Sequence, residues 1–355
     1  MFKNIYDLVD SKAMALYWNE IYSNSIPYLG TALFPDRKKL GLKLEFLKGY
    51  RSLPIALMPS AFDTKPTVRG RIGVKDFSTK MPFFRESMSL NEEDRQQLLM
   101  FQEMSNNTYA KQLMTNIFDD RANLVAGALV QSERMRMSLL VDGTIDISAP
   151  DKSGIVVNYK YNYDPEGEWV ESNTDVVTTN WSDPSADIYG DILAIKKDAQ
   201  ARGITLTRAI CTTKTWNYIC KNEAIKKDMN PVGYQNIIIS DADVKKYMVE
   251  KLGITFVTYD KMYKDEAQAD HQFYPDNYVT FLPDGTLGNT WYGTTPEEAD
   301  LMAGNKDADV EIVNTGVAIL NKKESLPVNI ITSVSQIVLP SFERMGDVFV
   351  LKVVK

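Results

Sequence analysis

The most informative stretch of the chain reads Phe281-Leu-Pro-Asp-Gly-Thr-Leu-Gly-Asn-Thr-Trp-Tyr-Gly293. Its aromatic and apolar positions favour strands, while Pro283 presets φ and Gly285 tolerates positive φ. The stretch therefore predicts a strand, a tight turn at Asp284 and Gly285, and a second strand. It contains no reactive group, so we interpret it as architecture.

Composition limits the functions that the chain can have. Its 355 residues, 44% hydrophobic and 10% aromatic, predict a folded protein with two or more subdomains. The net charge of -7 argues against a general polyanion binder. The N-terminus carries charge where a signal peptide needs apolar residues, and no segment is apolar enough to span a membrane. We expect synthesis in a reducing cytoplasm and no membrane partner.

Candidate catalytic residues are few. His271 is the only histidine, and the two cysteines, Cys211 and Cys220, fit no metal, redox or secreted disulfide spacing. A cysteine hydrolase, with a dyad of Cys211 or Cys220 and His271, stays open as a remote alternative, although both cysteines lie in apolar or aromatic settings typical of buried residues. The sequence also has no phosphate-binding glycine loop. We therefore expect no enzyme, no catalytic residue, no metal and no cofactor.

The first 88 residues have an unusual organisation. Residues 1–52 combine a short amphipathic helix, around Ile5 to Tyr22, with an extended piece. They form either an arm on another molecule or an ordinary helix packed on its own domain. Residues 53–88 predict a hairpin that cannot bury itself, and a two-stranded ribbon is marginal alone in water. Docking onto a neighbour is favoured over a solvated loop, because six basic residues stand against one acidic residue, Asp76, between Lys65 and Arg85: Lys65, Arg69, Arg71, Lys75, Lys80 and Arg85.

A helical period follows from Ser105 to Val141. Polar capping residues precede it and Asp142-Gly143 ends it, so about 35 residues form a rod of roughly 50 Å. The apolar stripe predicts packing on a sheet through Leu113, Ile117, Leu124, Ala128 and Met135.

The rest of the chain predicts an α+β fold with an insertion. Strands are expected at 144–148 and 154–161, and again at 328–339 and 347–354. The long helix and these strands are expected to share one domain. Between them, roughly 185–325 alternates helices and strands as an inserted α/β domain. The opening stretch belongs to this insert.

Short motifs in this order resemble the lambda-like capsid protein E family of tailed-bacteriophage major capsid proteins, which has the Hong Kong 97 capsid fold. The matching segments are Pro27-Tyr-Leu-Gly, Leu33-Phe-Pro35, Leu57-Met-Pro-Ser-Ala-Phe-Asp63, Arg69-Gly-Arg71, Met81-Pro-Phe-Phe-Arg-Glu86, Trp181-Ser-Asp-Pro184 and Phe281-Leu-Pro-Asp-Gly285. No single segment is a chemical signature, but the ordered set is specific and covers most of the chain.

The resemblance implies a role for each segment. Residues 1–52 become the N-arm, and 53–88 become the E-loop, whose basic residues contact an adjacent subunit. Residues 89–184 hold the spine helix and the first part of the peripheral domain. Residues 185–325 form the axial domain, in which Asp284 and Gly285 shape a subunit surface, and 326–355 are the return strands of the peripheral domain.

The resemblance also implies function and partners. Pentamers and hexamers would form an icosahedral or prolate head that encloses double-stranded DNA without sequence-specific binding. The expected partners are a separate scaffolding protein, a portal protein and, as a further candidate, a decoration protein. Assembly is expected in the bacterial host cytoplasm and the final location is the virion. A cellular compartment shell of the same fold, which packages a cargo enzyme, stays open as the alternative.

Overall fold

The structure is a computed structural model. It describes residues 10–23, 27–48, 75–90, 92, 96, 100, 107–150, 156–233, 239–265, 267–304, 309–325 and 328–355. The chain divides into two compact units. Unit 1 holds Met1–Glu45, Ser78–Met135 and Asn289–Ser341, and unit 2 holds Phe46–Phe77, Arg136–Gly288 and Phe342–Lys355. Helices and largely antiparallel sheets confirm the predicted α+β class.

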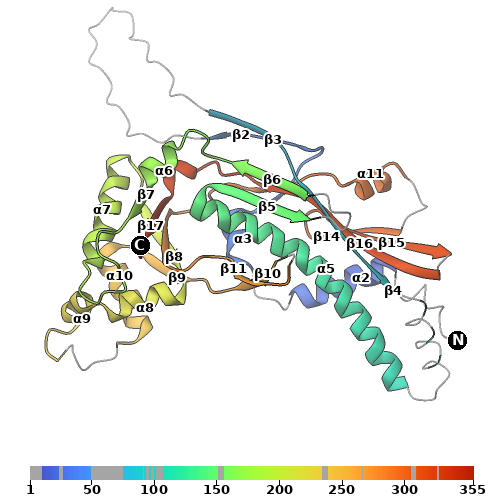
Figure 1. The fold of residues 1–355 in the computed structure, drawn as a ribbon, viewed down its shortest axis with the longest axis horizontal. Coiled ribbons are helices and arrows are strands. Elements are labelled where there is room, and N and C mark those ends of the chain that lie inside the picture. Colours follow the sequence, from blue (N-terminus) through green and yellow to red (C-terminus); the bar gives the residue numbers. More distant parts are fainter. Residues whose placement is uncertain are drawn as a thin grey trace, which may run out of the picture. The chain divides into compact units, whose positions relative to one another are not determined.

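Unit 1 is built on a six-stranded sheet centred on β16. Its strands are β1 (Asp36–Lys38), β4 (Phe83–Leu90), β13 (Thr290–Tyr292), β14 (Asp309–Val313), β15 (Val317–Ser325) and β16 (Val328–Pro340). One edge of β16 pairs with β15, which pairs with β14 (Figure 1). The other edge pairs first with β4 and then, from Val338, with β13, and β1 adds to β13 in parallel. Strand β16, which is thirteen residues long, thus pairs directly with three strands of this sheet, β4, β13 and β15.

Helices cover this sheet within unit 1. The helices are α2 (Ser11–Ser23), α3 (Leu29–Leu33), α11 (Pro296–Met302) and the part of α5 (Asn107–Asp142) that ends at Met135. Helix α2 packs on β14 and β15, and Met14 and Trp18 share one apolar core with residues of α5 and β15. Ser11 fixes the start of α2 by donating its N–H to Asp309 at 2.7 Å. The described part of the N-terminal helix therefore packs on its own domain, the second of the two interpretations left open above.

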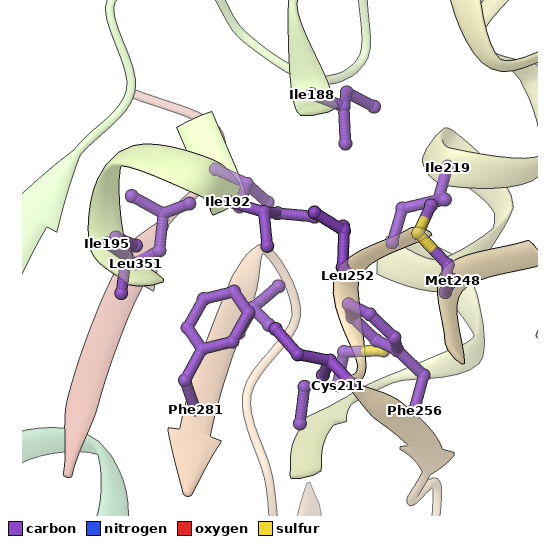
Figure 2. Close-up of a cluster of buried hydrophobic side chains, with 14 of the residues drawn as sticks. Ile188, Ile192, Ile195, Cys211, Ile219, Met248, Leu252, Phe256, Phe281 and Leu351 are labelled. Carbon is purple, nitrogen blue, oxygen red and sulfur yellow. The ribbon is translucent and has the colours of Figure 1, made fainter. Parts of the chain in front are cut away.

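Unit 2 surrounds a five-stranded sheet in the order β7-β17-β12-β8-β9. Its strands are β7 (Thr174–Val176), β8 (Leu206–Cys211), β9 (Thr255–Thr258), β12 (Tyr278–Pro283) and β17 (Phe349–Lys352). Its helices are α6 (Glu168–Asn173), α7 (Ile188–Ala201), α8 (Thr213–Lys221), α9 (Glu223–Met229), α10 (Asp241–Leu252) and the 3-10 turn η2 (Met345–Asp347). Ile192 of α7, Leu252 of α10 and Phe281 of β12 meet in its core (Figure 2).

Three two-stranded sheets complete the described chain. They pair β2 (Lys43–Lys48) with β3 (Lys75–Lys80), β5 (Thr144–Pro150) with β6 (Val156–Asn162), and β10 (Met262–Lys264) with β11 (Asp270–Gln272). In β5 and β6, Ile145 lies opposite Tyr161, and on the other face Asp146 pairs with Lys160 at 2.9 Å.

Two features of the topology differ from the prediction. The predicted strands on either side of Asp284 and Gly285 are present, but they do not share one domain, because β12 belongs to the unit 2 sheet and β13 to the unit 1 sheet. The two C-terminal strands also separate, since β16 lies in unit 1 whereas β17 pairs with β12 and β7 in unit 2. Local strand propensity identifies a strand but not its partner. The compact units therefore do not coincide with the predicted segments 185–325 and 326–355.

Candidate assembly site

Two nearly buried glutamates open helix α11 in unit 1. The helix begins at Pro296, where a missing N–H costs nothing, and the Thr295 side chain caps it by accepting a hydrogen bond from the Glu298 N–H. Glu297 and Glu298 are only 6% and 7% exposed. A buried carboxylate is costly unless it is paired and hydrogen-bonded, so this position requires cations.

The cations come from strands β1 and β4. Arg85 of β4 donates to one oxygen of Glu297, and Ser335 of β16 donates to the other at 2.8 Å. Lys38 of β1 lies 2.5 Å from a carboxylate oxygen of Glu298. These four charged residues, Arg85 with Glu297 and Lys38 with Glu298, are called the α11 clamp below. The clamp ties the first turn of α11 to strands β1 and β4, and the hydrogen bond from Ser335 adds strand β16.

The clamp changes how the basic residues of segment 53–88 are understood. Arg85 is held in its own chain by Glu297, with the guanidinium also 4.8 Å above the Phe83 ring. Lys80 is exposed on β3. The other predicted contacts lie outside the described side chains: Lys65, Arg69, Arg71 and Lys75. Contacts of these six residues with a neighbouring subunit stay a prediction.

An aromatic cluster of unit 2 residues contains one side chain from β2 and one from β3. The Phe77 ring of β3 stacks on Tyr163 with centroids 4.6 Å apart, and Phe46 of β2 lies 4.9 Å from Phe77. Tyr163 is fully buried, and burial raises the pKa of its hydroxyl well above the usual value. Stacked rings of this kind add stability beyond their buried area. The β2 and β3 pair is therefore anchored by side chains as well as by backbone hydrogen bonds.

Two arginines hold the turn at Asp284 and Gly285. Gly285 has a φ of +83°, the left-handed value that the turn sequence predicts. Arg208 of β8 and Arg344 donate to the backbone of the turn, and Arg344 also pairs with Asp347 at 2.8 Å. Burial lowers the pKa of Arg208, and nearby Asp284 partly offsets this. The four accepting carbonyls are those of Pro283, Asp284, Gly285 and Thr286.

The predicted packing residues of the long helix lie along α5. Ile117, Leu124 and Met135 are buried, and Ala128 is partly buried against the unit 1 core. The side chain of Leu113 lies outside the described part of the helix.

The cysteines and the histidine do not show the features of an activated dyad. Cys211 is fully buried in the unit 2 core, and burial raises the pKa of its thiol to about 12. Burial and Asp241, 3.6 Å away, likewise raise the pKa of the Cys220 thiol to about 12. The Nε2 atom of His271 lies 2.9 Å from Asp265. A nucleophilic cysteine needs a lowered pKa, and both thiols have the opposite shift.

The described residues contain no cluster of three or more histidine, cysteine or carboxylate side chains that could hold a metal ion. Within the same residues, no helix has the length and apolar character that a bilayer crossing requires.

Sequence reasoning missed the α11 clamp and the arginines at the turn. The adjacent acids after Thr295-Pro296 indicate only a helix start. Their partners lie 212 and 260 positions away in the chain, and no local pattern marks such pairs. Arg208 and Arg344 are likewise distant from the turn in the sequence, and only the folded chain brings them to its carbonyl groups.

Comparison with known proteins agrees with this architecture. Residues 10–353 match the family model described as phage major capsid protein E. No curated protein matches the chain.

Several solved structures share the fold. A prophage protein of Escherichia coli CFT073, described as a capsid protein, is 12% identical with a TM-score of 0.56 over 97% of this chain and 99% of that one. A phage-related protein of Bordetella bronchiseptica RB50 is 11% identical, with a TM-score of 0.52 and 97% of each chain covered. The capsid of cyanophage A-1(L) is 13% identical, with a TM-score of 0.53 and 94% of each chain covered. At these identities the similarity concerns the fold alone, and it confirms the predicted α+β fold class.

Proposed function

The chain belongs to the phage major capsid protein E family and forms a capsid shell in the virion, and from this premise we propose that its copies assemble as pentamers and hexamers. The resulting icosahedral or prolate head would enclose double-stranded phage DNA. The observation that carries the proposal is the family match over residues 10–353, because it includes the sheets and cores of both compact units.

We assign the contact with the adjacent subunit to residues 53–88. Strand β4 supports this, because its residues 85–89 are exposed although it pairs along most of its length with β16. The α11 clamp and the stacked ring of Phe77 fix the described part of this segment, residues 75–88, within the subunit. A fixed base reduces the conformational entropy that is lost when the segment docks on a neighbour.

We assign the axial role to segment 185–325, whose helices α7 to α10 pack with strands of the five-stranded sheet in the core of unit 2. Copies of this part would meet around five-fold and six-fold axes. The turn at Asp284 and Gly285 follows this core directly in the chain, and its arginine contacts give it a fixed shape suited to a subunit surface.

The remaining partners follow from the proposed assembly. A separate scaffolding protein would guide shell closure in the bacterial host cytoplasm, a portal protein would occupy one vertex, and a decoration protein is a further candidate for the outer surface. The chain has 47 acidic and 40 basic residues. This net negative charge supports enclosure of DNA without sequence-specific binding, because a negative surface repels phosphates.

Electron microscopy of the chain, expressed alone and with its scaffolding protein, tests the proposal. Closed shells or isolated capsomers are expected. Small monodisperse monomers in both preparations would contradict it. Mass spectrometry of isolated shells separates the two shell functions: DNA with portal and tail proteins supports the phage head, whereas a single cargo enzyme supports the cellular compartment.

A further inference from the structure

A buried arginine on the long helix has no hydrogen-bond partner for its Nη atoms among the described residues. Arg121 of α5 is 2% exposed. Neither of its Nη atoms has a hydrogen-bond partner in the part of the chain that the structure describes. Buried arginines are rarely found unpaired, because a guanidinium has five N–H donors and a permanent charge.

The helix itself cannot supply the partner. The residues three and four positions away, which share a helical face with Arg121, are all hydrophobic: Ile117, Phe118, Leu124 and Val125. Asp119 and Asp120 directly precede it, but neighbouring positions on a helix point in different directions. Asp119 instead accepts a hydrogen bond from the hydroxyl of Tyr17.

The unpaired charge is costly in the single chain. Burial lowers the pKa of Arg121 to about 10, so the guanidinium still carries its charge at neutral pH. The paired carboxylates of the α11 clamp show that unit 1 can satisfy buried charge where both partners are present. Arg136, equally buried on the same helix, is engaged by other groups of the chain. Arg121 thus differs from these other buried charges, because its Nη atoms have no hydrogen-bond partner in the described part of the chain.

We propose that Arg121 is a receptor for a carboxylate of a second copy of this chain, which reaches it only when copies assemble. This inference rests on the proposed shell function. A carboxylate is the group whose two oxygens match the fork of guanidinium donors. Each chain has more acidic than basic residues. In a shell built from identical chains, the carboxylates nearest to Arg121 outside its own chain therefore belong to neighbouring copies. Because Arg121 is covered in the single chain, contact requires a local rearrangement on assembly.

Substitution of Arg121 tests the proposal through two measurements on each variant. Arg121→Met keeps approximately the length of the side chain and removes the charge. Arg121→Lys keeps the charge but removes the planar guanidinium, whose N–H donors can bind both oxygens of a carboxylate. Arg136→Met is the matched control, since it removes a buried arginine that is engaged within the chain. Thermal unfolding is measured on unassembled protein, and the concentration threshold for shell formation is measured by sedimentation and electron microscopy.

For Arg121→Met we expect a melting temperature equal to or above that of the wild type, because replacing an unpaired buried charge with an apolar group removes a desolvation cost. We expect its assembly threshold to rise about tenfold or more, and that of Arg121→Lys to rise less. Arg136→Met should lower the melting temperature. A wild-type assembly threshold for Arg121→Met overturns the inference, and so does a lowered melting temperature, which would reveal a partner within the chain. Failure of the wild type to assemble would instead contradict the proposed function.

Discussion

Replacing Arg85 with methionine should destabilise unit 1 more than any change of comparable size on its exposed surface. The substitution removes the cation of Glu297, which is 6% exposed and would remain as a buried, unpaired carboxylate. Loss of one partner of a buried pair costs about 3–5 kcal/mol. We expect about 3 kcal/mol, the lower end, because the Arg85 side chain is 44% exposed and Ser335 still donates to Glu297.

The reciprocal change should cost less. Glu297→Gln leaves Arg85 without its carboxylate, but this side chain is exposed enough to be hydrated, so we expect about 1–2 kcal/mol. The double variant Arg85→Met with Glu297→Met should recover part of the loss, because no unpaired charge remains.

Thermal unfolding of unassembled protein measures these effects. A loss of 3 kcal/mol corresponds to roughly 6–12 °C in a domain of about 150–250 residues. Lys322→Met is the control, because Lys322 pairs with Glu324 on the surface and its side chain is 67% exposed. Its effect should stay within about 0.5 kcal/mol. Equal effects of Arg85→Met and Lys322→Met would refute the reasoning.

Three further substitutions or probes test other parts of the fold. Gly285→Ala should cost about 1–2 kcal/mol in thermal unfolding because Gly285 has a φ of +83°, while Gly285→Asn should cost less; equal costs would argue against backbone strain. Gly293→Ala should cost about 1–3 kcal/mol, because the new Cβ would lie 2.8 Å from the carbonyl oxygen of Gly41, and an unchanged melting temperature would contradict this close approach. With the pKa of Cys211 and Cys220 raised to about 12, only about one thiol in ten thousand is ionised at pH 8, so thiol reagents should label the folded chain slowly and the unfolded chain rapidly. Fast labelling of the folded chain would revive the hydrolase alternative.

Local features of the fold could be predicted from the sequence. The long helix was predictable because capping residues, helical periodicity and Asp142-Gly143 mark its ends, and α5 runs from Asn107 to Asp142. The turn at Gly285 was predictable because proline, aspartate and glycine in this order need a specific backbone geometry. Each of these signals depends on residues within one or two turns of the chain.

The partners of these elements could not be predicted in the same way. Residues 281–293 favour two strands on either side of a turn, but a strand on each side of a turn forms a hairpin only if the two pair with each other. Here the edges of β12 are taken by β8 and β17, and β13 lies between β1 and β16. Strand propensity contains no information on which distant edge is available. The α11 clamp could not be predicted for the same reason, because its ion pairs join residues that only the completed sheet brings together.

The buried charges of unit 1 illustrate what a shell subunit needs from its own sequence. Residues that must keep one geometry before assembly have their counterions within the chain, as Arg85 and Lys38 do at the first turn of α11. A subunit that satisfied every buried charge in this way would gain nothing electrostatic from meeting its neighbours. An unpaired guanidinium such as Arg121 makes the isolated chain less stable and the assembled state relatively more favourable, because its desolvation cost is already present before the partner arrives. The same helix can therefore hold the subunit together and favour its assembly, through arginines that differ only in whether their partners belong to the same chain.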